Sequence, residues 1–237
     1  MILELKNITF WYDDKEIFSN LSLCIARWDY IGIFWENGKG KTTLLKIILS
    51  ILKPWDGEVI WYDEAWKAQK RNPYSIQYIS QKWYMLDSII PITVREVLSI
   101  SRKYSDSQRV NAKDKTCSYE TIESALSHVW LITYIDVPFK SLSEWQKQRA
   151  LIAKALIETP DIIMLDEPTA SIDIPMQQSF YELLDHLRMV HHITILFISH
   201  DIRFLREKVE RIWYVGEDTS PEIMKIFPKS NVEFLHS

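Results

Sequence analysis

The chain has 237 residues, 47% hydrophobic and 25% charged, which is enough for one large globular domain with its own core. The formal net charge of -4 gives no electrostatic reason to expect a nucleic-acid partner, because domains that neutralise many phosphates are usually basic overall. Two cysteines are too few for a disulfide framework, and no basic and apolar leader follows Met1, so we expect a protein of a reducing compartment. No apolar run approaches the roughly 18 residues that cross a bilayer, so the protein would need a partner to work at a membrane.

The first quarter of the chain predicts strands and then a helix. Residues 2–12 and 17–25 have strand-like apolar alternation, and residues 30–34 form a short buried run. The stretch 41–51, KTTLLKIILSI, has apolar residues at helical spacing and ends before Pro54. The segment between them therefore leads from a buried strand into a helix N-terminus, where unpaired N–H groups and the positive end of the helix dipole can bind an anion.

Strands and helices alternate through the rest of the chain. Strands are predicted at 57–64 and 74–80, and the region from about 83 to 156 is mostly helical, with an exposed polar connection at 105–118. A buried strand at 161–168, a helix at 176–190 and a second buried strand at 193–201 follow. This order predicts an α/β protein with a parallel sheet covered by helices, and the pattern does not indicate a role for the segment from Gly216 onward.

The loop FWENGKGKT, residues 34–42, is one residue away from the phosphate-binding pattern G-x-x-x-x-G-K-[ST]. Gly38 and Gly40 would let backbone N–H groups converge on a β-phosphate. Lys41 can reach the β and γ oxygens, and the Thr42 hydroxyl can bind Mg²⁺. Trp35 stands where the pattern has its first glycine, so a chance GKGKT in a basic loop is the alternative reading.

Two acids follow the apolar run IIML of the strand at 161–168. At the end of a buried strand, Asp166 can hold the shell of a Mg²⁺ ion, and the adjacent Glu167 can polarise an attacking water. An acidic turn after any core strand is the alternative.

Together with these two motifs, five further elements make the chain resemble the ATP-binding subunit of an ABC transporter, over almost its whole length and in the family's order. The stretch SLSEWQ at 141–146 resembles the LSGGQ signature, and the KQRALIAKAL that follows matches the family's helix. Single residues occupy the other motif positions: Tyr12 the adenine-stacking aromatic, Gln81 in YISQK the Q-loop glutamine, Asp173 the end of the D-loop DEPTASID, and His200 in ISHD the switch histidine. Taken singly, Tyr12 could be an ordinary strand aromatic, Gln81 a solvated loop residue and His200 a cap.

The resemblance implies a P-loop NTPase of the ABC ATPase type, with a RecA-like parallel-sheet core, an N-terminal antiparallel β-subdomain and an inserted α-helical subdomain. We expect a single ABC ATPase domain over residues 1–237. The nucleotide-binding core with the β-subdomain would comprise 1–82 and 157–215, the helical subdomain with the signature motif 83–156, and the C-terminal tail 216–237.

The resemblance also implies a homodimer that binds two ATP molecules head to tail, each with Mg²⁺. In one copy ATP would be bound by Tyr12, Trp35, Glu36, Asn37, Gly38, Lys39, Gly40, Lys41, Thr42, Thr43 and Asp166. The facing copy would contribute Ser143, Glu144, Trp145, Gln146 and Asp173. Thr42, Gln81 and Asp166 would hold the Mg²⁺, Glu167 would activate water, and His200 and Gln81 would complete the catalytic set.

The expected partners are separate integral membrane permease subunits and an extracytoplasmic substrate-binding protein, with this chain peripheral on the cytoplasmic face of the membrane and no nucleic acid. The stretches DSIIPITVREVL and ASIDIPMQQSFYELLDHL are similar to ATPases of zinc, manganese and iron importers, so we expect import of a divalent metal that does not touch this chain. Another system, such as lipoprotein release, is an alternative. A soluble ABC protein acting on ribosomes or DNA would need a second such domain or a long inserted arm.

Glycine and tryptophan are present in abnormal numbers, 5 and 10, whereas average usage predicts about 16 glycines. Both departures from the motifs are glycine to tryptophan, and five tryptophans fall at common glycine positions of the family: Trp11, Trp28, Trp35, Trp130 and Trp145. A bulky side chain there is expected to strain the backbone and to block the phosphate, which would give a hydrolysis-deficient subunit. The alternative hypothesis is that these positions are glycines encoded by UGA, whereas Trp61 and Trp213, in strand-like stretches, are genuine.

Overall fold

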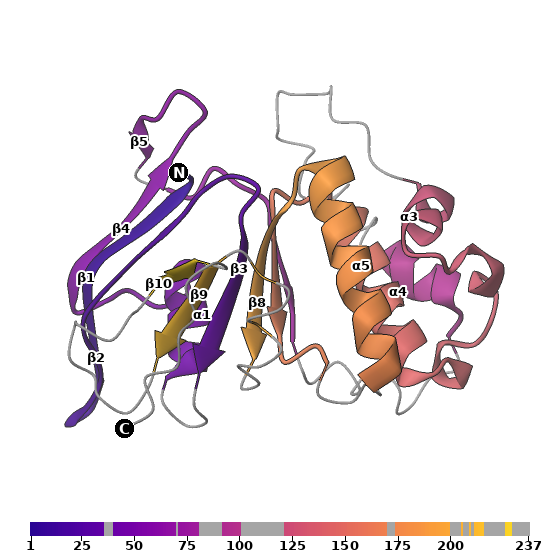
Figure 1. Ribbon diagram of the computed structural model, residues 1–237, viewed down its shortest axis with the longest axis horizontal. Helices are drawn as coiled ribbons and strands as arrows, with labels where there is room; N and C mark the ends of the chain where they lie inside the picture. The colour runs from indigo at the N-terminus through magenta and orange to yellow at the C-terminus, as the bar shows by residue number, and fades with distance from the viewer. Residues whose placement is uncertain are drawn as a thin grey trace. The chain divides into compact units, whose positions relative to one another are not determined.

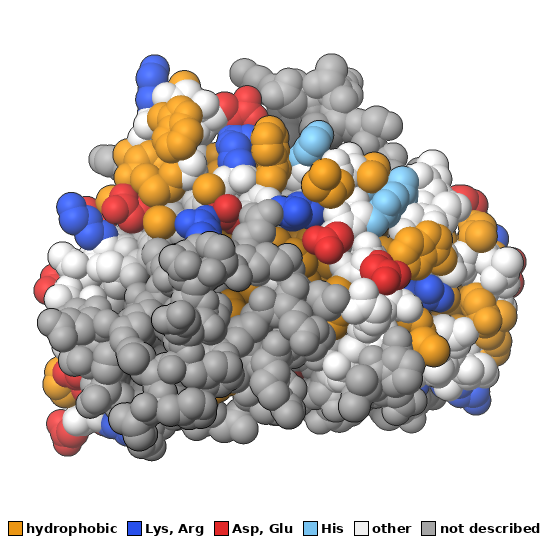
Figure 2. Space-filling view, viewed as in Figure 1, with side chains coloured by type: hydrophobic (Ala, Val, Ile, Leu, Met, Phe, Trp, Pro, Cys, Tyr) orange, Lys and Arg blue, Asp and Glu red, His pale blue; other side chains and the backbone are white. Residues whose placement is uncertain are grey.

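The structure is a computed structural model that describes residues 1–35, 40–69, 71–80, 92–100, 121–169, 174–199, 205, 209, 211–215 and 226–228. The chain forms two compact units, Met1–Tyr74 with Thr194–Ser237, and Ser75–Ile193. Hydrophobic and charged side chains are interspersed on the face shown in Figure 2, as is usual for a protein surface.

The first unit begins with an antiparallel sheet in the order β2-β1-β4-β5 (Figure 1). Its strands are β1 (Leu3–Tyr12), β2 (Lys15–Ile25), β4 (Asp56–Tyr62) and β5 (Ala68–Gln69). In β1 the buried side chains are Leu3 and Leu5 and, after a register shift between Leu5 and Ile8, Ile8 and Phe10. The apolar alternation thus holds on each side of this irregularity, which shifts its phase by one residue. The expected N-terminal antiparallel β-subdomain is therefore present.

The same unit contains parallel strands. The strand β3 (Tyr30–Trp35) pairs in parallel with β8 (Thr194–Ser199) on one side and with β9 (Arg211–Val215) on the other. Every residue of β8 is buried, which is typical of a strand covered on both faces. The strand β10 (Ile226–Pro228) pairs antiparallel with β9, so the segment expected to be a tail contains a short strand that the sequence pattern did not indicate.

Among the described residues, the second unit contains two parallel strands and most of the helices. The strand β6 (Ile76–Ile79) pairs in parallel with the fully buried β7 (Ile162–Asp166). Residues 94–100 are helical, and α3 (Ile122–His128), α4 (Glu144–Leu156) and α5 (Ile174–His191) follow (Figure 1). Two 3₁₀ turns, η2 (Ile132–Tyr134) and η3 (Phe139–Ser141), lie between α3 and α4. Within the described part of the predicted helical region, residues 92–100 and 121–156, the helices are confirmed, with these short turns as an addition.

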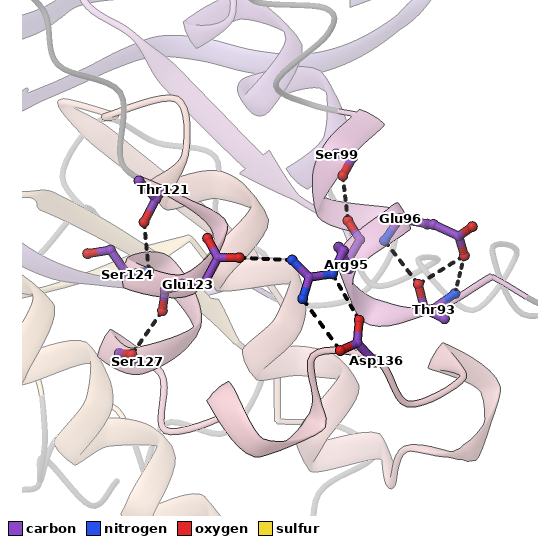
Figure 3. Close-up of polar contacts among 9 residues, drawn as sticks. All are labelled: Thr93, Arg95, Glu96, Ser99, Thr121, Glu123, Ser124, Ser127 and Asp136. Atoms are coloured by element: carbon purple, nitrogen blue, oxygen red, sulfur yellow. Dashed lines mark hydrogen bonds and ion pairs between the residues drawn. The ribbon is translucent and has the colours of Figure 1, made fainter.

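A guanidinium group joins three segments of this second unit (Figure 3). Arg95, in the helical stretch 94–100, donates from Nε to Asp136 Oδ1 at 2.9 Å and from Nη1 to Glu123 Oε1 of α3 at 2.8 Å. The N-terminus of the same stretch has a capping box: the Glu96 carboxylate accepts from the Thr93 N–H at 2.7 Å, and Thr93 Oγ1 accepts from the Glu96 N–H at 3.3 Å. Arg95 is thus held on a capped helix and fixes that helix to α3 and to the η2–η3 connection.

The Arg95 contacts predict a stability that depends on pH. The hydrogen bond from Arg95 holds the pKa of Asp136 below its ordinary value of 3.8, so this contact stabilises the fold above that pH and is lost as the pH falls through the lower folded-state pKa. We expect Arg95→Ala to lower the free energy of unfolding at pH 7 and to differ less from the parent at pH 3.

Urea unfolding at the two pH values measures this difference. Arg71→Ala, which removes an exposed arginine outside the cluster, is the control and should change little at either pH. An equal loss of stability for Arg95→Ala at pH 7 and at pH 3 would contradict the expected contribution of Asp136.

Candidate functional site

In the first unit, the end of the predicted phosphate loop is fixed by a glycine that cannot be replaced without strain. The helix α1 (Lys41–Ile48) begins after Gly40, its N-cap, whose φ of 98° lies in the left-handed region. A Cβ at this position would lie 2.3 Å from Ile17 Cγ2 of β2. Gly40 is therefore required both by its backbone angles and by the close approach of β2.

The N-terminus of α1 has the composition of an anion site. It has no acidic residue in the first turn, and it begins with the half-buried Lys41 and the exposed Thr42. Thr43 is buried, together with the apolar face of the helix, so α1 is anchored in the core below its first turn. The N–H groups of a helix N-terminus, a lysine and a hydroxyl at one helix end suit the oxygens of a phosphate and of its metal ion.

Tyr12 lies near this helix end within the same unit. It is the last residue of β1 and pairs with Lys15 of β2, two residues before the Ile17 that contacts Gly40. Its side chain is 44% exposed, and the Phe10 ring supports it edge-on at a centroid distance of 5.0 Å. An exposed ring held in this way can stack on a planar ligand, as expected for the adenine-binding aromatic.

In the second unit, β7 carries the two predicted acids to its end. Asp166 and Glu167 are 8% and 6% exposed, so both carboxyl groups lie in surroundings that favour interaction partners over water. Glu167 has a φ of 51°, a left-handed conformation that is unusual for its type. Strained backbone of this kind is often found where a side chain must be held in one direction for a reaction.

Tyr78 is a neighbour of this pair that the sequence did not single out. It lies on β6, and its Oη donates a hydrogen bond to Asp166 Oδ2 at 2.9 Å. Partial burial of a ring that remains 38% exposed, followed by the Asp166 charge and this hydrogen bond, raises the pKa of the Tyr78 phenol, which stays protonated as a donor.

The signature stretch of the second unit forms the start of α4. Ser143 is its N-cap: Ser143 Oγ accepts from the Gln146 N–H at 3.2 Å, and Gln146 Oε1 accepts from the Ser143 N–H at 2.9 Å. In addition, Lys147 Nζ donates to Glu144 Oε1 at 3.1 Å. Ser143 Oγ acts as an acceptor in this capping box, and its O–H can still donate, for example to an anion.

Trp145 does not show the backbone strain that its glycine position predicted. It lies in the right-handed first turn of α4, outside the left-handed region, so that part of the expectation is wrong. Its ring packs edge-on against Phe180 at 5.6 Å, and the Arg149 guanidinium lies over it at 5.0 Å. The fold thus accommodates a tryptophan at position 145. Its ring could affect ligand binding only by occupying space that the ligand needs.

Several expected site residues lie outside the described residues: Glu36, Asn37, Gly38, Lys39, Gln81, Asp173 and His200. Trp35 is the last residue of β3. Over the described ranges, no group of three or more His, Cys, Asp or Glu side chains could hold a metal ion. Within the same ranges, no helix is both long and apolar enough to cross a membrane.

Known proteins resemble this chain in sequence and in fold. The family model described as ABC transporter matches residues 18–170. The zinc uptake system ATP-binding protein ZurA of Listeria monocytogenes is 33% identical over 213 residues, which cover 89% of this chain and 81% of the relative. The high-affinity zinc uptake system ATP-binding protein ZnuC of Bacillus subtilis is 31% identical, and 89% of each chain is covered.

Solved structures agree with this assignment at the level of the fold. The chain cbiO1 from Clostridium perfringens, part of the ABC transporter complex cbiONQ, superposes with a TM-score of 0.74 at 24% identity and covers 90% of this chain and 84% of that one. A dimeric ATP-binding cassette in a post-hydrolysis state with ADP and phosphate gives a TM-score of 0.71 at 24% identity, covering 98% and 100%. The predicted P-loop fold is confirmed, and the chain belongs to the ABC transporter family, among its ATP-binding subunits.

Proposed function

We propose that the chain hydrolyses ATP and thereby energises transport through a separate membrane permease. The observation that carries the proposal is the buried pair Asp166 and Glu167 at the end of β7, in a chain whose α1 begins with the lysine and threonine of a phosphate loop. One carboxylate for the metal shell and an adjacent one for the attacking water are the acidic groups that ATP hydrolysis needs.

The donor set fits Mg²⁺, which prefers carboxylate and hydroxyl oxygens and keeps several of its waters. Thr42 and Asp166 would hold the ion, with Gln81 as a third ligand. When bound, Mg²⁺ neutralises charge on the β- and γ-phosphate oxygens. Lys41 would bind those oxygens, Glu167 would accept a proton from water, and His200 would contact the γ-phosphate.

The proposed site is completed by a second copy. The start of α4 presents the Ser143 hydroxyl and the positive end of a helix dipole, which are suited to a phosphate bound by another chain. We therefore propose a head-to-tail homodimer in which Ser143, Glu144, Trp145, Gln146 and Asp173 of one copy face the ATP of the other. The subdomain division at residues 82, 156 and 215 belongs to the same proposal.

We further propose import of a divalent metal, such as zinc or manganese. The support is the function named for the relatives, which include the zinc transport system ATP-binding protein AdcC of Streptococcus pneumoniae, 31% identical over 222 residues. The chain would lie on the cytoplasmic face of the membrane, beside permease subunits supplied with metal by an extracytoplasmic binding protein. Neighbouring genes for a multi-span permease and a metal-binding lipoprotein would favour metal import over lipoprotein release.

Hydrolysis depends on what stands at positions 35 and 145. With tryptophan at both, a large ring would occupy the space that the phosphate loop and the signature need for close contact with phosphate. We propose that both positions are glycine in the natural protein, so that the chain is a competent ATPase.

Steady-state hydrolysis of MgATP by the printed chain and by the double variant Trp35→Gly/Trp145→Gly tests both proposals. We expect turnover by the double variant and little by the printed chain. Adding Glu167→Gln to the double variant should lower the rate by about 10²–10⁴-fold, the usual contribution of a general base, while ATP binding is retained.

Two results would contradict these expectations. A double variant that neither binds nor hydrolyses ATP would overturn the proposed ATPase. Equal rates for the printed chain and the double variant would overturn the idea that tryptophan at these positions blocks the site.

A further inference from the structure

Two observations, one on a side chain and one on the backbone, lead beyond the proposed ATPase. The first concerns Tyr78. Across the parallel pair of β6 and β7, Tyr78 lies opposite Met164, and Asp166 is two residues further along the same strand. Side chains two residues apart point to the same face of a sheet, so Tyr78 and Asp166 share a face. The long phenol side chain spans this step and reaches Asp166 Oδ2 at 2.9 Å.

The contact fixes one of the two carboxylate oxygens. A buried carboxylate can rotate about its last bond unless a donor holds it, and metal-binding carboxylates are commonly oriented by such outer hydrogen bonds. A phenol is a suitable donor because it is neutral and does not compete with the cation for the carboxylate charge. With Oδ2 engaged by Tyr78, Oδ1 would be the oxygen offered to a metal shell.

We infer that Tyr78 is a positioning residue for Asp166, which orients that carboxylate for the Mg²⁺ ion of the nucleotide. The inference rests on the proposed function. Tyr78 itself touches neither nucleotide nor metal in this assignment and acts through Asp166.

The test is Tyr78→Phe in the chain carrying Trp35→Gly/Trp145→Gly, with hydrolysis measured as a function of Mg²⁺ concentration. We expect the half-saturating Mg²⁺ concentration to rise about tenfold, the lower end of what loss of an outer-shell partner costs, with kcat largely recovered at saturating Mg²⁺. Tyr62→Phe is the matched control, because Tyr62 Oη donates to the Glu4 carboxylate at 2.6 Å in the other unit. It loses the same kind of hydrogen bond and should leave the Mg²⁺ dependence unchanged.

A second measurement separates this inference from the ATPase. ATP binding is measured at increasing Mg²⁺ concentration for the chain with Trp35→Gly/Trp145→Gly and for the same chain with Tyr78→Phe. If Tyr78 orients Asp166, Tyr78→Phe should shift the Mg²⁺ dependence of ATP binding to about tenfold higher Mg²⁺. An unchanged Mg²⁺ dependence of binding, or of hydrolysis in an active chain, overturns the inference, whereas the expected shift in binding without hydrolysis overturns only the proposed function.

The second observation concerns three tryptophans in left-handed backbone. The φ angles are 62° at Trp28, 61° at Trp66 and 56° at Trp130, in a region where a bulky residue is an outlier. Their side chains are 53%, 67% and 48% exposed, so burial of the ring does little to offset the backbone cost. The sequence pattern alone does not mark Trp66 as a glycine position.

Trp130 occupies the position at a helix end that most often holds glycine. It follows the C-cap Val129 of α3, and its N–H donates to the Ser127 carbonyl at 3.0 Å, while the Leu131 N–H donates to the Leu126 carbonyl at 2.8 Å. These two bonds are the Schellman motif, whose residue after the C-cap must be left-handed. Glycine is strongly preferred there because it has no Cβ.

Trp66 occupies the corresponding position of a hairpin. Between β4 and β5, the Asp63 N–H donates to the Lys67 carbonyl at 3.0 Å, and the Trp66 N–H donates to the Asp63 carbonyl at 3.1 Å. The loop between Asp63 and Lys67, residues 64–66, is a two-residue turn followed by the left-handed Trp66. Glycine is the usual choice at such a last position. Trp28 is likewise the second of two turn residues between β2 and β3, and its N–H donates to Thr194 Oγ1 at 3.0 Å.

Two other tryptophans have the opposite character. Trp61 of β4 and Trp213 of β9 are 2% and 1% exposed and are among the largest fully buried side chains among the described residues. Their strands have ordinary extended backbone, and removing either ring would leave a large cavity. Ser50 and Thr159 also have positive φ, so a positive φ alone does not indicate a glycine position. The indication is the combination of positive φ with a large exposed ring.

The geometry points to glycine at positions 28, 66 and 130 of the natural protein and to tryptophan at positions 61 and 213. Peptide sequencing of the protein from its source organism by mass spectrometry tests this directly, and the gene should have UGA at the first three positions and UGG at the last two. Tryptophan in any of the first three peptides, encoded by UGG, overturns the inference for that position.

Stability provides a second test on recombinant protein. Trp28→Gly, Trp66→Gly and Trp130→Gly should each raise the midpoint of thermal unfolding by about 2–4 °C, since relief of a left-handed bulky residue is worth that shift in a chain of this size. Trp61→Gly should lower it, because its ring fills the core. A fall in the midpoint for the three exposed positions would count against glycine there.

Discussion

Left-handed backbone at the chain reversals is the constraint on which much of this fold depends. Gly40 can start α1 this close to Ile17 of β2, at a φ of 98°, only because it has no Cβ. The ends of α3 and of the β4–β5 hairpin make the same demand at Trp130 and Trp66. An L-residue with a side chain adopts this conformation only at a steric cost. The residue type at each reversal therefore affects the stability of the flanking helices and strands.

The long elements could be predicted from the sequence because their periodicity is strong. Helix α4 and strand β7 have continuous apolar patterns that suit only one conformation each, and the Ser143 and Gln146 spacing is a recognisable capping box. The 3₁₀ turns η2 and η3 and the strand β10 are three residues each, too short for a periodic signal. Tyr78 could not have been found from spacing, since 88 residues separate it from Asp166 and only the pairing of two strands brings them together.

The mistaken expectation at Trp145 shows that a glycine in a motif can have two different physical reasons. At Gly40 both apply: the backbone is left-handed and a neighbouring side chain is too close. At Trp145 the backbone is helical and accommodates the ring between Phe180 and Arg149, so only the space required by a ligand can account for glycine at this motif position. A motif read from sequence does not separate these reasons, whereas φ does.

The planar guanidinium of Arg95 has a mechanical consequence. Its Nε and Nη2 both donate to the Asp136 carboxylate, the Nη2 contact being 3.4 Å long, and its Nη1 donates to Glu123. A forked contact of this kind resists rotation as well as separation, because turning the helix would shorten one bond while lengthening another. The stretch 94–100 and α3 are thereby held in a fixed relative orientation, so that a rotation of one helix is passed on to the other.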